Sequence, residues 1–156
     1  GLGTLAAMVM SEHSGREAID LGRALQMMLI HDLVEIDAGD TYCYDEQGRL
    51  DQAERELRAA GRIFGLLPDS QAAELRGLWD EFEERATPEA RFAHAMDRFQ
   101  AFLHNDGTGG EVWLRNGIRR EQVLARMRPL SEGAPVLWEY VKTLIEDAVA
   151  KGYLKG

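Results

Sequence analysis

Apolar residues recur along this chain at the three- and four-residue spacing of amphipathic helices, and no segment shows the alternation typical of strands. The strongest pattern covers residues 16–36. Within it, residues 25–30 are apolar nearly all round, as expected for a helix buried at the centre of a bundle. Shorter patterns predict further helices over residues 2–13, 51–65, 70–85, 88–105, 119–128 and 132–151. We therefore expect an all-α fold, a single-domain bundle of about six or seven helices.

Local signals indicate where several of these helices begin and end. Gly15 is expected to end the first helix, and Gly39 with the residues after it ends the long one. Ser70 and Thr87 are predicted N-caps, because their hydroxyl groups can accept a hydrogen bond from the first turn. Pro88 would then occupy the first helical position, where proline is favoured.

Composition and charge restrict the classes of function. The chain has 156 residues, of which 45% are hydrophobic and 29% charged, as in an ordinary globular domain. Its formal net charge of -9 disfavours binding to a nucleic acid polymer. The longest nearly apolar run, residues 2–10, is too short to span a bilayer, so no membrane partner is expected. Binding of a small anion would therefore require a metal ion or a few placed basic residues.

A single cysteine, Cys43, excludes an internal disulfide and fits a reducing, cytoplasmic compartment. We interpret Cys43 as a small apolar filler rather than a nucleophile.

Residues 31–40 carry most of the candidate chemistry. On a helix His31 and Glu35 share a face, and Asp32 lies about 100° away. An imidazole with carboxylates suits Mn, Fe, Co, Ni or Zn better than calcium. The alternative is a structural core histidine with solvated acids at a helix end, although acids are electrostatically unfavourable there. These ten residues alone leave both interpretations open.

Two stretches together resemble a known family. HDLVEIDAGD at residues 31–40 is followed by TYCYD, and residues 87–105 contain the tetrapeptide AMDR around Asp97. This combination resembles the HD-domain metal-dependent phosphohydrolases, nearest to the branch of bacterial 5'-deoxynucleotidases and small HD domain-containing hydrolases. The similarity runs from about residue 4 to residue 150 and implies an all-α HD-type bundle.

The resemblance also implies a site and an activity. His31, Asp32 and Asp97 would bind a divalent metal ion, one of Mn, Co, Mg, Zn, Fe or Ni. Glu35 would orient or deprotonate the attacking water, and Asp40 would support the water or the leaving group. The implied substrate is a small phosphate monoester, in particular a nucleoside 5'-monophosphate, and the related proteins are commonly homodimers.

The family normally supplies another histidine ligand from an E-H-[ST] motif upstream of the long helix. Here His13 is not assigned that role, so we expect the first-ligand segment to lie outside residues 1–156. The alternative function is a non-catalytic HD-scaffold module that binds a nucleotide or a protein partner.

The remaining polar candidates are interpreted mainly as structural. We expect His94, His104 and Asn105 to have structural roles. Arg98 is expected to pair with a carboxylate or reach a phosphate, and the acids within residues 80–84 to form a solvated helix face. The tryptophans are expected to anchor the core or an interface: Trp79, Trp113 and Trp138.

Overall fold

Nearly every element of the computed structural model, which describes residues 2–15, 18–39 and 51–156, is a helix. The α-helices are α1 (Leu2–Met10), α2 (Leu21–Ala38), α3 (Gln52–Phe64), α4 (Asp69–Glu84), α5 (Pro88–Gly107), α6 (Glu111–Asn116), α7 (Arg120–Met127), α8 (Leu130–Gly133) and α9 (Pro135–Ala150), and a 3-10 helix, η1, covers Ser11–His13. The isolated bridge between Arg119 and Lys155 is the one strand-like pairing in these ranges. The all-α prediction is confirmed.

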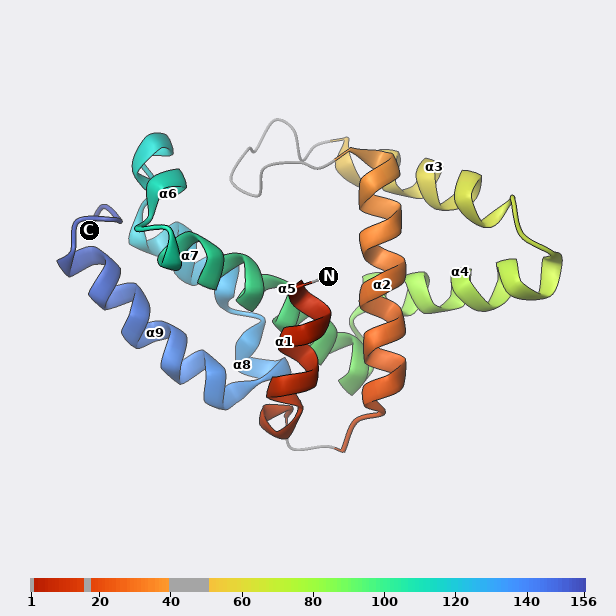
Figure 1. Ribbon diagram of the computed structural model, residues 1–156, viewed down its shortest axis with the longest axis horizontal. Helices are drawn as coiled ribbons and strands as arrows, with labels where there is room; N and C mark the ends of the chain where they lie inside the picture. Colours follow the sequence, from red (N-terminus) through yellow and green to blue (C-terminus); the bar gives the residue numbers. More distant parts are fainter. Residues whose placement is uncertain (1, 16–17, 40–50) are drawn as a thin grey trace.

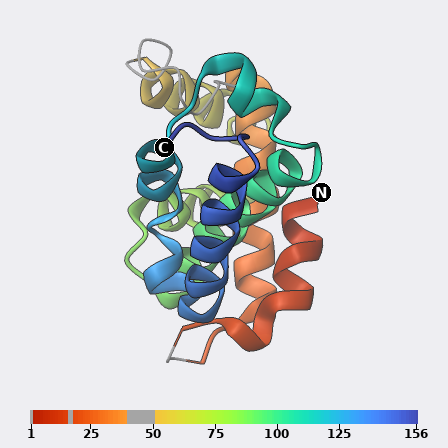
Figure 2. The same cartoon turned by 90° about the vertical axis from the view of Figure 1, so that its left-hand side faces the viewer.

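Helix α5 forms the centre of the bundle. It packs against α1, α2, α4, α7 and α8 (Figure 1), and most side chains of residues 90–99 are buried. Phe92, Met96, Phe99 and Phe102 supply its largest contributions to the main core. In the views of Figures 1 and 2, α9 lies along the side of the bundle formed by α7 and α8.

Helix α2 is less enclosed than its apolar sequence predicts. It begins at Leu21, later than expected, because the Asp20 carboxylate caps it by accepting a hydrogen bond from Arg23 N at 3.0 Å. Its inner face packs on α1, α3, α4 and α5, but Leu29, Leu33 and Ile36 are 47%, 49% and 79% exposed. The prediction that residues 25–30 lie at the centre of the bundle was therefore wrong for one side of the helix.

Helices α3 and α4 extend from one side of α2 and close a smaller core there (Figure 1). Ile30 and Val34 of α2 pack in this core with Phe64 of α3 and Trp79 of α4. The smaller core fixes α4 against the middle of α2, where His31 lies.

A polar network joins the N-terminal turn of α2 to the junction between α4 and α5. Glu81 accepts hydrogen bonds from Arg23 Nε at 2.9 Å and from Thr87 Oγ1 at 2.7 Å. The Thr87 side chain also accepts from Ala90 N at 3.2 Å, which confirms its predicted role as the N-cap of α5. This network fixes the mutual position of the three helices that build the site.

Two features of the helix ends differ from the sequence prediction. Ser70 lies inside α4, whose N-cap position is occupied by Pro68 without a side-chain hydrogen bond. The short helices α6 and α8 form within segments predicted as loops or as parts of longer helices, which raises the helix count above six or seven. None of the helices in the described ranges combines the length and the apolar character needed to cross a bilayer.

Candidate metal centre

His31 lies on the inner face of α2, where its side chain is removed from solvent. It is 7% exposed, and its neighbours on the same face of α2, Met27, Met28 and Val34, are buried. The imidazole stacks on the Phe82 ring of α4, with ring centroids 4.3 Å apart. A polar ring in this position must find polar partners, because burial without them is costly.

One carboxylate lies close to the first ring nitrogen, and a second lies near the other nitrogen but beyond hydrogen-bond distance. His31 Nε2 lies 3.3 Å from Glu35 Oε1, one turn later on α2, and His31 Nδ1 lies 3.7 Å from Glu83 Oε1 on α4. Burial acts to lower the pKa of His31, but the hydrogen bond and charge of Glu35 outweigh it. The pKa of His31 is therefore raised above its ordinary value, and the charges of Asp97 and Glu83 contribute to the rise.

Asp97 on α5 faces the same cluster. Burial raises the pKa of its carboxyl group above the ordinary value, and the negative charges of Glu35 and Asp32 raise it further. The positive charges of His31 and Arg126 act in the opposite direction. The structure therefore brings His31, Asp32, Glu35 and Asp97 within electrostatic reach of one another.

The acids of residues 80–84 do not all form a solvated face, so that prediction was wrong for two of them. Glu81 joins the network with Arg23 and Thr87, and Glu83 faces His31. Burial raises the pKa of Glu83, an effect that the positive charge of His31 partly offsets. The sequence does contain a signal for this position of Glu83, because Glu83 borders the apolar face of α4 that Trp79 and Phe82 form.

The donor set matches the charge and chemistry of a divalent transition metal ion. Carboxylates from three helices (Glu35, Glu83 and Asp97) act on one imidazole, and Asp32 acts on Asp97, so negative charge is in excess; a mixed nitrogen and oxygen set suits Mn, Fe, Co, Ni or Zn. Within the described part of the chain, however, no three His, Cys, Asp or Glu side chains form a group that could hold a metal ion as they stand. His31 Nε2 faces Glu35 instead. The residues therefore fit a metal ion chemically, and coordination requires their side chains to reorient.

Comparison with known families decides the classification of this fold. The HD domain family model matches residues 3–138, a range that includes His31, Asp32 and Asp97. The chain belongs to the HD domain family.

The relatives of this HD domain include proteins named 5'-deoxynucleotidase HDDC2. The protein from Danio rerio is 30% identical over 86 residues, which cover 55% of this chain and 43% of the relative. The protein from Mus musculus is 30% identical over 99 residues, which cover 64% of this chain and 49% of the relative. This HD domain thus spans about half the length of the curated relatives it matches.

A solved structure has the same fold over nearly the whole chain. The crystal structure of a predicted metal-dependent phosphohydrolase from Magnetospirillum magnetotacticum MS-1 matches with a TM-score of 0.92 and 45% sequence identity. The match covers 99% of this HD domain and 76% of that chain.

Some of the predicted residues lie outside the cluster or outside the described residues. Asp40 and Cys43 fall within residues 40–50, which the structure does not describe. His104 is exposed near the end of α5, and Arg98 donates from Nη1 to the carbonyl oxygen of Arg126 at 2.7 Å. Two of the tryptophans are core residues, as predicted: Trp79 and Trp113.

His94 lies one turn before Asp97 on α5 and has the buried environment expected of a structural histidine. It is 6% exposed, stacks on Phe82, and its Nε2 lies 3.0 Å from the Phe82 carbonyl oxygen. Burial lowers the pKa of His94 to about 2, and the positive charges of Arg85 and Arg98 add to this effect. His94 is therefore neutral near neutral pH.

This environment predicts a loss of stability on acidification. Because the pKa of His94 is about 2 in the folded state and about 6.5 in an unfolded chain, the unfolded state takes up the proton first. The contribution of His94 to the free energy of unfolding is complete above about pH 6.5 and falls by up to about 1.4 kcal/mol per pH unit below it. Urea denaturation at about pH 7 and about pH 5.5 measures this change.

The variant His94→Gln isolates the contribution of the histidine, because the glutamine amide is polar and does not titrate. Its free energy of unfolding should fall less between the two pH values than that of the wild-type protein, by about 1 kcal/mol. Equal pH dependence in both proteins would contradict the assignment.

Proposed function

We propose that this HD domain is the catalytic domain of a metal-dependent phosphohydrolase that acts on a small phosphate monoester, in particular a nucleoside 5'-monophosphate. The observation that carries the proposal is the cluster of carboxylates around one buried imidazole, which leaves negative charge for a divalent cation to neutralise. The names of the relatives, 5'-deoxynucleotidase and metal-dependent phosphohydrolase, support the same activity.

His31, Asp32 and Asp97 are the proposed metal ligands, from α2 and α5. Such a metal ion, when bound, polarises a phosphoryl oxygen and lowers the pKa of a bound water. Burial of the cluster strengthens these electrostatic effects, because the surrounding helices exclude water of high dielectric constant.

Glu35 is the proposed proton acceptor for the attacking water. Its pKa is lowered, chiefly by the hydrogen bond with His31, so it is ionised near neutral pH and can act as a hydrogen-bond acceptor. Arg126 lowers the pKa of the same carboxyl group and that of Asp97, and so offsets part of the repulsion between them. Asp40, outside the described residues, is the proposed supporting group for the water or the leaving group.

A second candidate function is a non-catalytic HD domain that binds a nucleotide or a partner protein. It is favoured by one observation: in the described ranges no three ligand-type side chains form a group ready to hold a metal ion. Elemental analysis of the full-length protein separates the two candidates, because a binding module need not hold a stoichiometric transition metal.

The proposed activity is tested by phosphate release from a panel of nucleoside monophosphates with Mn, Co or Mg. We expect metal-stimulated release by the full-length protein and its loss in Asp32→Ala. The control is Asp147→Ala, which removes an exposed carboxylate of α9 that pairs with Lys151. Absence of metal-stimulated release from every substrate, or equal release by Asp32→Ala, would contradict the proposal.

A homodimer and a cytoplasmic location complete the proposal. The exposed apolar side chains Val136 and Tyr140, on the final helix α9, supply surface for a dimer contact. Light scattering with size-exclusion chromatography measures the oligomeric state directly.

A further inference from the structure

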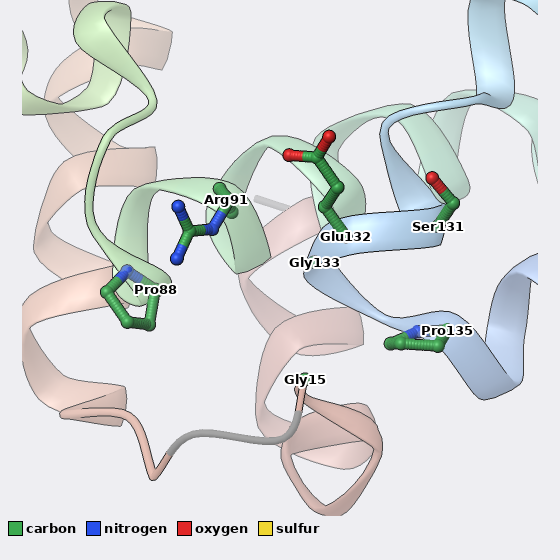
Figure 3. A pocket seen from close by; sticks show the side chains of 7 residues that line it. All are labelled: Gly15, Pro88, Arg91, Ser131, Glu132, Gly133 and Pro135. Carbon is green, nitrogen blue, oxygen red and sulfur yellow. The ribbon is translucent and has the colours of Figure 1, made fainter.

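A pair of adjoining cavities lies beside the site, between α5 and the segment that joins α7 to α9. One cavity has a volume of about 380 Å³ and the other of about 330 Å³, and both are lined by Arg91, Ser131 and Glu132. Figure 3 shows Pro88 and Arg91 of α5 on one side of the first cavity and Ser131 of α8 with Pro135 of α9 on the other. Each volume is large enough for a small ligand.

The second cavity is strongly basic for a chain with a net charge of -9. Arg85, Arg91 and Arg128 line it, against a single acid, Glu132. Arginine is the side chain best suited to bind phosphate, because its planar group donates two parallel hydrogen bonds. The lining therefore favours an anion.

Arg85 has an uncharged hydrogen-bond partner in this cavity. Its Nε donates to His94 Nε2 at 3.0 Å, and His94, with a pKa of about 2, is neutral. Several other surface arginines in the described ranges do pair with a carboxylate, as Arg115 does with Glu111. The His94 imidazole thus accepts a hydrogen bond from Arg85 but does not neutralise its positive charge.

His94 itself also has a polar atom that lacks a partner. The ring lines the cavity, and His94 Nδ1 is buried without a hydrogen bond to any of the described residues. A buried polar atom in this state costs free energy. The described polar groups around the His94 ring therefore leave one of its two nitrogens without a partner.

The backbone conformation of Arg85 is also unusual. Its φ of 56° places it in the left-handed region at the C-cap of α4, a position where glycine is preferred. A side chain there is strained, and in this structure the Arg85 side chain contacts His94 at the cavity.

We propose that the cavity lined by Arg85, Arg91 and Arg128 binds the phosphate group of a small molecule, at a place separate from the metal ligands. Phe82 stacks on both His31 and His94, at ring distances of 4.3 Å and 3.9 Å, so the anion site adjoins the metal site through one shared aromatic ring. The proposal requires neither a bound metal nor catalysis and does not rest on the proposed function.

The test is isothermal titration calorimetry of the full-length protein in EDTA, with inorganic phosphate, adenosine 5'-monophosphate and adenosine as the probes. We expect both phosphate-bearing probes to bind and adenosine not to bind. Arg85→Gly and Arg128→Gln should each weaken binding about tenfold or more, because each removes a charged donor. Arg85→Gly should fold at least as well as the wild-type protein, since glycine adopts the left-handed conformation without strain.

The matched control is Arg115→Gln, which removes an exposed arginine of α6 and should bind the probes as tightly as the wild-type protein does. If phosphate and adenosine 5'-monophosphate bind with similar affinity, free phosphate is identified as the ligand. If the nucleotide binds much more tightly, a phosphorylated metabolite is identified. Either result supports the proposal. Absence of binding, undiminished binding by Arg85→Gly and Arg128→Gln, or an equal loss in Arg115→Gln would overturn it.

Discussion

Replacing Asp97 with asparagine is expected to lower metal-stimulated phosphate release by more than about 100-fold, since even residues that only support a ligand contribute about 10- to 100-fold. Without metal the variant should be at least as stable as the wild-type protein. The pKa of the Asp97 carboxyl is raised by burial and by the charges of Glu35 and Asp32, so its removal relieves repulsion. The rise in Tm that a bound metal gives to the wild-type protein should be absent from the variant.

Asp147→Asn is the matched control for this experiment. It makes the same chemical change at an exposed position of α9, and the ion pair that it removes is worth about 1 kcal/mol or less. Phosphate release and the metal-induced change in Tm should both persist in the control. An Asp97→Asn protein that still releases phosphate at the wild-type rate would remove Asp97 from the proposed ligand set.

The variant Gly133→Ala should lower the free energy of unfolding by about 3 kcal/mol, at the upper end of the range usual for overpacked cores. Gly133 ends α8 where α8 crosses α5. A Cβ atom there would lie 2.3 Å from the carbonyl oxygen of Arg91 and 2.8 Å from the Cβ of Ala95. Because the nearest obstacle is backbone, it cannot rotate away, and α8 must move off α5. In thermal denaturation the expected fall in Tm is about 10 °C.

Gly77→Ala makes the same substitution where the new methyl group meets nothing. Gly77 is exposed inside α4, and no atom lies within 4 Å of an added Cβ. Alanine should raise the free energy of unfolding by about 0.5–1 kcal/mol, because glycine loses more backbone entropy in a helix. The two substitutions should therefore act in opposite directions, and a stable Gly133→Ala protein would show that α5 and α8 are not packed as closely as described.

Predictions made from local sequence signals succeeded where the deciding interactions are local. The all-α fold follows from the spacing of apolar residues, and Thr87 caps α5 through a hydrogen bond that spans three residues. Asp20 carries the same kind of signal for α2, and the helix therefore begins later than the apolar pattern alone predicts. Ser70 has a capping side chain but does not cap α4, because that helix begins at Asp69 and Ser70 lies inside its first turn.

Predictions about burial failed where contacts with other helices decide the outcome. The apolar residues Leu29, Leu33 and Ile36 are exposed, because the helices that α2 contacts in the described part of the chain pack against its other sides. Glu83 sits in a charged run that suggests a solvated face, yet it faces His31 because Trp79 and Phe82 turn that side of α4 inward. The metal ligands and the roles of Glu35 and Asp40 remain predictions.

The sequence by itself determined the helical class and the shared face of His31 and Glu35, since both depend on interactions within a few residues of helix. Only the tertiary structure decided which distant groups act on that face: Asp97 and Glu83 reach His31 from α5 and α4. It also decided that Arg85, Arg91 and Arg128 line one cavity. The physical reason is that electrostatic and packing energies depend on distances in space, which the spacing of residues along a chain does not specify.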